Sequence, residues 1–160
     1  MSLIFGIDPA LAKTGWAVVR HDKESNKFIY ISSGLIKTSS TDEMPFRLAY
    51  IFHNIRKILS EHELINKIAI EKSFINNNAV SSLKLAAARG AIMAAIGYKK
   101  NIIFNEISPN KIKRSISLSG HSDKKQIISM VRLIISSIPD DYSLSEDEAD
   151  AIACAYAMSI

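Results

Sequence analysis

The sequence contains a single cysteine, Cys154, and only four prolines and six glycines among its 160 residues. One cysteine excludes an internal disulfide and makes no zinc-binding pattern. Because Cys154 lies in an alanine-rich helical run, we interpret it as a small core residue. Repeats, low-complexity segments and linkers rich in proline, glycine or serine are also missing. We therefore expect one domain over residues 1–160, which is long enough to bury a sizeable core.

No apolar run in the sequence reaches the length of a membrane span. We therefore expect that the protein neither crosses a membrane nor has one as a partner. The N-terminus does not begin with a basic segment followed by a short apolar one, as a secretory signal does. The composition is 48% hydrophobic and 22% charged, which is typical of globular domains. These features together predict a cytoplasmic protein.

Basic residues are absent from the C-terminal part of the chain. Residues 140–160 hold six acids and no lysine or arginine, so they carry a charge of −6, whereas residues 1–139 carry +10. A basic body suits a polyanionic partner, but a concentrated acidic segment would repel that partner unless something neutralises it. Seven bases lie between residues 99 and 125: Lys99, Lys100, Lys111, Lys113, Arg114, Lys124 and Lys125. Phosphate binding would explain this cluster, and a solvated basic face is the alternative.

Hydrophobic periodicity and turn residues predict a chain of alternating strands and helices. Strands are predicted over residues 2–8, 14–20, 27–37, 66–71 and 102–107. Helices are predicted over residues 43–63, 79–98, 111–116, 123–137 and 145–158. Short links make the first three strands an antiparallel meander, and the later alternation of helix and strand predicts a mixed α/β sheet with helices on its faces.

Carboxylates follow two of the predicted strands and begin the last helix. Asp8 ends the first strand and Glu71 ends the fourth, so they would share one edge if these strands are parallel neighbours. Asp147 and Asp150 are three residues apart and share a helix face. Four converging carboxylates would raise one another's pKa. Mg²⁺, which prefers carboxylate oxygen, would remove that penalty, and two such ions can activate water and stabilise the leaving oxygen of a phosphodiester.

Each of these acids also has a simpler interpretation. A lone aspartate at a strand end is commonly a turn or cap residue, and acids near a helix start are favoured by the helix dipole. Glu146, four residues before Asp150, is a rival for the same helix face. The combination of strand-end acids, a helix-start pair and a basic body favours the metal site.

Several motifs occur in a fixed order along almost the whole chain. They are GIDP at 6–9 with TGW at 14–16, IEKSF at 70–74, NNNAVSSLKLAAARGA at 76–91, GHSDKKQ at 120–126 and DEADAIA at 147–153. In these motifs the sequence resembles the RuvC family of crossover junction endodeoxyribonucleases. The resemblance implies an RNase H-like fold: a mixed five-stranded sheet, three antiparallel strands first and then parallel ones, with helices on both faces.

The resemblance also implies roles for particular residues. Asp8, Glu71, Asp147 and Asp150 would bind two Mg²⁺ ions, for which Mn²⁺ can substitute, and these ions would drive hydrolytic cleavage of DNA. The protein would act as a homodimer that nicks two like-polarity strands of a four-way (Holliday) junction symmetrically. The RuvA–RuvB branch-migration complex would be a further partner.

Supporting residues are implied by the same resemblance. Phe74 would stack on an unpaired base near the crossover, although it could instead anchor its own loop. Lys113 and Lys124 match lysines close to the catalytic centre, and Lys84 and Arg89 are further candidates for DNA contacts. The helix over 79–98 would form the dimer interface, unless it is wholly buried within one chain.

Two departures from the family pattern and three other functions stay open. Ala10 stands where the family often has glycine, and alanine disfavours a positive φ. Glu146 and Glu148 leave the ligand set of the last helix undecided. The alternatives are an actin-like phosphotransferase, suggested by GIDP and TG but lacking a second glycine-rich loop, a junction-binding protein without catalysis, and an RNase H-like nuclease acting on another branched nucleic acid.

Overall fold

The computed structural model describes residues 1–72, 78–116 and 124–159, and for residues 124 and 125 the backbone only. Its strands are β1 (Ser2–Asp8), β2 (Lys13–Asp22), β3 (Lys27–Lys37), β4 (Ile65–Glu71) and β5 (Ile103–Ile107). Its helices are α1 (Met44–Glu61), α2 (Ala79–Ile96), α3 (Pro109–Ile116), α4 (Lys124–Ile134) and α5 (Glu146–Ala157). Every predicted element is present, with its ends shifted by a few residues.

The strands form one mixed sheet with the order β3-β2-β1-β4-β5. Strand β1 pairs antiparallel with β2, and β2 pairs antiparallel with β3. On the other side of β1, strands β4 and β5 run parallel to it. The predicted fold class is therefore confirmed, and β1 lies at the point where the antiparallel half of the sheet meets the parallel half.

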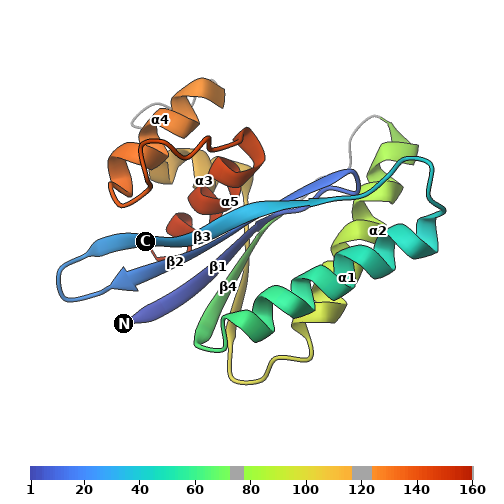
Figure 1. Cartoon of the computed structure of the whole chain (residues 1–160), viewed down its shortest axis with the longest axis horizontal. Helices are drawn as coiled ribbons and strands as arrows, with labels where there is room; N and C mark the ends of the chain where they lie inside the picture. Colours follow the sequence, from blue (N-terminus) through green and yellow to red (C-terminus); the bar gives the residue numbers. More distant parts are fainter. Residues whose placement is uncertain (73–77, 117–123, 160) are drawn as a thin grey trace.

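Helices cover both faces of this sheet (Figure 1), and each face has its own core. Helices α1 and α2 lie side by side on one face, and Phe5 and Ile7 of β1 belong to the core on this face. Helices α3, α4 and α5 lie on the other face, where Ile4 of β1 packs against α5. The alternation of side chains along β1 thus supplies both cores, as expected for a central strand.

Two glycines allow α5 to lie directly on the strands. A Cβ atom at Gly6 would stand 2.1 Å from the carbonyl oxygen of Ala151, and one at Gly15 would stand 2.1 Å from the carbonyl oxygen of Asp147. No side chain fits at such distances, so these positions require glycine for close approach of the backbones. The α5 residues on this side are small and buried, among them Cys154, which confirms its interpretation as a core residue.

Helix α2 corrects one expectation. By length and composition alone, Ala79–Ile96 could cross a membrane, with a hydropathy of 1.4 and 22% of the segment buried. The expectation that no apolar run reaches this length was therefore wrong. The same helix packs on α1 and the sheet through Ala88, Ile92, Ala95 and Ile96, so one face of it belongs to the core of the domain.

Helix α4 ends earlier than predicted, at Ile134 rather than at residue 137. Ser137 Oγ instead accepts a hydrogen bond of 2.8 Å from the backbone N–H of Tyr30 on β3. Serine has a low helix propensity because its hydroxyl competes for backbone groups, and Pro139 follows two residues later. The segment after α4 is thus held against the edge strand instead of extending the helix.

Candidate metal centre

The ends of β1 and β4 bring two predicted ligands to one edge of the sheet. These strands are parallel neighbours, with Ile7 opposite Ile70. Asp8 and Glu71, the next residues, therefore end the two strands side by side. This confirms the strand arrangement on which the prediction depended. Burial raises the pKa of both carboxyl groups, and the charge of Glu71 raises that of Asp8 further.

The electrostatics show that all four predicted acids lie near one another. The pKa of Asp8 is raised from 3.8 to about 8, first by burial and then by the charges of Glu71, Asp150 and Asp147. Burial also raises the pKa of Glu71, although Asp8, Lys113 and Arg89 act in the opposite direction. Such mutual destabilisation of carboxylates is what bound divalent cations relieve.

The donor set fits hard divalent cations, because it consists of carboxylate oxygens in a partly buried cluster with unfavourable charge. Within residues 1–72, 78–116 and 124–159, no three acid, histidine or cysteine side chains are already gathered into a metal cage. One of the four carboxylates is turned to another partner: Asp147 Oδ2 lies 2.8 Å from Lys13 Nζ. The acids are therefore neighbours that interact by charge, and an ammonium group takes part in their neutralisation.

Lys13 was not predicted as a site residue. It is the first residue of β2, on the face of the sheet that α5 covers, next to the close contact of Gly15 with Asp147. The sequence shows a lysine in the turn after GIDP but does not show that this turn lies under the last helix. Only the packing of α5 on β2 reveals the ion pair.

The turn between β1 and β2 is held by Thr14. Its hydroxyl donates to the carbonyl oxygen of Ala10 at 2.6 Å and accepts from the backbone N–H of Ala10 at 3.3 Å. Among the described residues other than glycine, only Asn26 and Asn101 have a positive φ. Ala10 therefore has an ordinary backbone conformation, and alanine in place of glycine does not strain the turn that presents Asp8.

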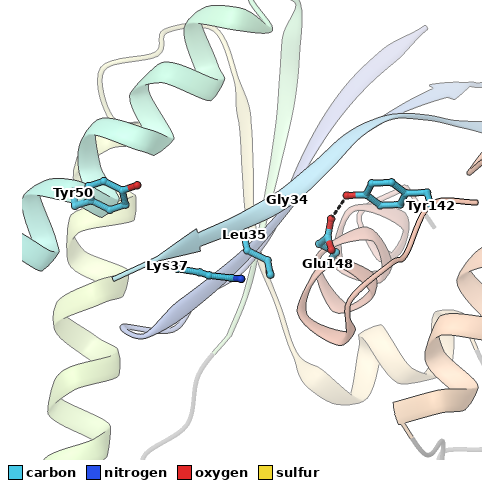
Figure 2. Close-up of a pocket in the computed structure, with 6 residues that line it drawn as sticks. All are labelled: Gly34, Leu35, Lys37, Tyr50, Tyr142 and Glu148. Atoms are coloured by element: carbon cyan, nitrogen blue, oxygen red, sulfur yellow. Dashed lines mark hydrogen bonds between the residues drawn. The ribbon is translucent and has the colours of Figure 1, made fainter. Parts of the chain in front are cut away.

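Glu148 is occupied by hydrogen-bond donors from its own chain. It accepts hydrogen bonds from the hydroxyls of Ser33 at 2.8 Å and Ser145 at 2.6 Å. It also accepts one from the hydroxyl of Tyr142 at 2.5 Å, which Figure 2 shows. Together with the Ser145 side chain it forms a capping box at the start of α5. Burial alone would raise the pKa of Glu148, but the donors from Ser145, Tyr142 and Ser33 outweigh burial and lower it.

Arg89 lies beneath the site rather than on an open surface. Its guanidinium donates to the backbone carbonyl of Glu71 and forms an ion pair of 2.6 Å with Glu106 on β5. Its side chain is only 12% exposed. Arg89 thus connects α2 to the ends of β4 and β5, a structural role that sequence reasoning did not anticipate. Its predicted contact with DNA stays a prediction, and two protein groups already bind this side chain.

The other predicted DNA contacts are placed to different extents. Lys113 on α3 is close enough to Glu71 to lower its pKa, so it lies beside the acids. Lys84 is exposed on α2. Lys124 begins α4, but its side chain is not described, and Phe74 lies outside the described residues.

The chain matches the family model described as "Crossover junction endodeoxyribonuclease RuvC" over residues 4–158. A protein of that name from Rickettsia prowazekii is 47% identical over 154 residues, covering 96% of this chain and 94% of its own. One from Rickettsia bellii is 46% identical over 155 residues, with 96% and 94% covered.

Solved structures show the same fold at lower identity. Thermus thermophilus RuvC in complex with a Holliday junction substrate superposes with a TM-score of 0.86 and 22% identity, covering 99% of this chain and 93% of that one. The yeast mitochondrial Holliday junction resolvase Ydc2 gives a TM-score of 0.68 and 13% identity, covering 98% and 78%. The sequence matches, which extend over nearly the whole chain, show that this protein belongs to the RuvC family of crossover junction endodeoxyribonucleases.

Proposed function

We propose that this protein is a metal-dependent Holliday junction resolvase that nicks two like-polarity strands of a four-way DNA junction symmetrically, in homologous recombination and DNA repair. The observation that carries the proposal is that the charges of Glu71, Asp147 and Asp150 all act on Asp8 at the end of β1, in a member of this endonuclease family. The likeness to Thermus thermophilus RuvC, solved with a junction substrate, supports junction DNA as the substrate.

The four carboxylates would hold Mg²⁺ or Mn²⁺, two ions in each site. When bound, these ions supply an activated water and stabilise the leaving oxygen of the phosphodiester. The chain itself supplies the orientation of the ligands: the parallel strands present Asp8 and Glu71, and the glycine contacts hold the start of α5 over them. Lys113 adds a positive charge beside Glu71, where negative charge on the DNA phosphate would be stabilised.

Binding of the junction is assigned to the basic and aromatic residues that the family resemblance indicates. Lys84, Lys113 and Lys124 would contact phosphates, and Phe74 would stack on an unpaired base, a contact of about 1–3 kcal/mol. The net charge of +10 over residues 1–139 supports a polyanionic partner. The RuvA–RuvB complex as a partner and a cytoplasmic location are part of the same proposal.

A homodimer is proposed through α2. One face of this helix is exposed and apolar over its whole length, at Leu83, Ala86, Gly90 and Met93. A Cβ at Gly90 would meet nothing within 4 Å, so this face has room for a second helix at short distance. Isologous packing of this face on itself would place two sites in one particle, as two symmetric nicks require.

An immobile four-way junction, labelled on one strand at a time, tests the proposal. With Mg²⁺ we expect paired nicks at symmetric positions, and with EDTA or in Asp8→Asn we expect binding without nicks. Nicking by Asp8→Asn at the rate of the unmodified protein would overturn the metal site. Binding without nicks in Mg²⁺ and Mn²⁺, over several junction sequences, would leave a binding protein. Nicks in other branched substrates but not in four-way junctions would indicate a different nuclease of this fold.

A further inference from the structure

Two lysines lie directly opposite each other beside the proposed metal site. Lys13 of β2 pairs with Lys37 of β3 in the antiparallel ladder. Residues that pair in this way point to the same face of the sheet, and like charges at such positions destabilise the pair. Both lysines are exposed at the end of the sheet where Asp8 lies. The ladder therefore places two like charges side by side at this end of the sheet.

The protein compensates only one of these two charges. Lys13 Nζ binds Asp147 Oδ2 at 2.8 Å. The ammonium group of Lys37 has no hydrogen bond or ion pair to any residue that the structure describes. The pair therefore carries one uncompensated positive charge, on Lys37. Its partner in the ladder, Lys13, binds Asp147, a carboxylate that we assign to the metal.

Lys37 also lines an open surface pocket of about 460 Å³ (Figure 2). The pocket is lined by Gly34, Leu35, Lys37, Tyr50, Tyr142 and Glu148. Tyr50 of α1 is 51% exposed and brings a hydroxyl that can donate to an anion. Glu148 is the acid in this lining, and its carboxylate accepts from Ser33, Tyr142 and Ser145, which reduces its repulsion of an anion.

We propose that Lys13 and Lys37 form a binding site for a DNA backbone phosphate that flanks the scissile one. The inference rests on the proposed function and extends it, since the two lysines lie on the β3 side of the acids while Lys113 lies on the opposite side, beside Glu71. A phosphate between the two ammonium groups removes their mutual repulsion. It also guides the scissile strand across the acids from the β3 edge of the sheet.

The first test compares two lysines of the same strand. Lys37→Gln and Lys27→Gln are each made in the Asp8→Asn protein, and binding to a four-way junction is measured without metal over a series of salt concentrations. Lys27 is the matched control, because it is exposed at the other end of β3, opposite Asp22. We expect Lys37→Gln to reduce the slope of log K against log salt by about 0.9, the value for one lost phosphate contact. Equal slopes for the two variants would overturn the proposal.

The second test locates the phosphate. Junctions carry one uncharged methylphosphonate at a time on either side of the cleavage position, and nicking in Mg²⁺ is compared between the unmodified protein and Lys37→Gln. We expect one flanking position to slow the unmodified protein and to leave Lys37→Gln unaffected, since its contact is already lost. Equal sensitivity of both proteins at every position would contradict the site.

These outcomes separate the site from the proposed function. If the unmodified protein nicks no junction, the proposed function fails. If it nicks normally and the Lys37→Gln and Lys27→Gln proteins behave alike in both tests, only the phosphate site fails.

Discussion

Helices α2 and α5 are both alanine-rich, but they are covered to very different extents. Helix α5 is buried from Glu148 to Ala157 apart from two of its residues, and it lies on strands whose glycines let its backbone approach closely. Helix α2 buries only Ala88, Ile92, Ala95 and Ile96, and leaves an apolar face open. Similar compositions thus serve two purposes: α5 packs closely on the sheet with acids in its first turns, and α2 keeps one apolar face exposed, which we propose as the dimer interface.

The substitution with the largest expected effect is Gly15→Ala, which removes the close contact between β2 and α5. The new Cβ would stand 2.1 Å from the carbonyl oxygen of Asp147, so α5 must move and take Asp147 and Asp150 with it. We expect the free energy of unfolding to fall by about 1–3 kcal/mol and junction cleavage to be lost. Calorimetry and a cleavage assay measure both effects. Normal cleavage by this variant would show that the contact does not position the ligands.

A charge placed on the exposed apolar face of α2 tests the proposed dimer interface. Gly90→Glu adds a carboxylate where no atom of the same chain lies within 4 Å, so the monomer should keep its fold. We expect the dimer to become a monomer by light scattering, with circular dichroism unchanged. Lys84→Glu on the same helix is the control for added negative charge. A dimer that survives Gly90→Glu would place the interface elsewhere.

The acids beneath α5 should make stability depend on pH. The folded pKa of Asp8 is about 8 and its reference value is 3.8, so the folded state binds more protons between these values. Stability should therefore be greatest at low pH in this window and fall as pH rises toward about 8. Asp8→Asn should flatten this dependence, and Mg²⁺ should restore stability at pH 8. Urea unfolding at a series of pH values measures the effect, and equal pH profiles for both proteins would argue against a buried acid cluster.

The smallest expected effect is the loss of stability when the N-cap residue of α2 or of α5 is replaced. Asn78 caps α2 by accepting from the backbone N–H of Ser81 at 3.0 Å, and Ser145 caps α5. Removing a cap costs about 1 kcal/mol. Ser145→Ala should cost more than Asn78→Ala, because it also takes a donor from the buried Glu148. Thermal unfolding of both variants gives the comparison, and a larger loss for Asn78→Ala would contradict the importance of the Glu148 network.

Local rules predicted the parts of the site that depend on single elements. Strand ends gave Asp8 and Glu71, and the three-residue spacing on a helix gave Asp147 and Asp150. The strand order then required only that β1 and β4 be parallel neighbours, which the alternation of helix and strand indicated.

Contacts between distant segments could not be predicted in the same way. Glu148 resembles Asp147 in the sequence, and only Ser33 and Tyr142, brought close by the fold, separate their roles. The Lys13–Asp147 pair depends on how near α5 approaches β2, which Gly15 determines. The inward position of Arg89 on α2 depends on its ion pair with Glu106 of β5.

The close seating of α5 on β1 and β2 has a consequence for protein synthesis. Domains generally fold as units, and α5 supplies much of the core on its face of the sheet. A nascent chain that ends before Asp147 therefore lacks half of the proposed ligands and also much of this core. We expect the proposed ligand set and this core to be completed together, once α5 has been synthesised.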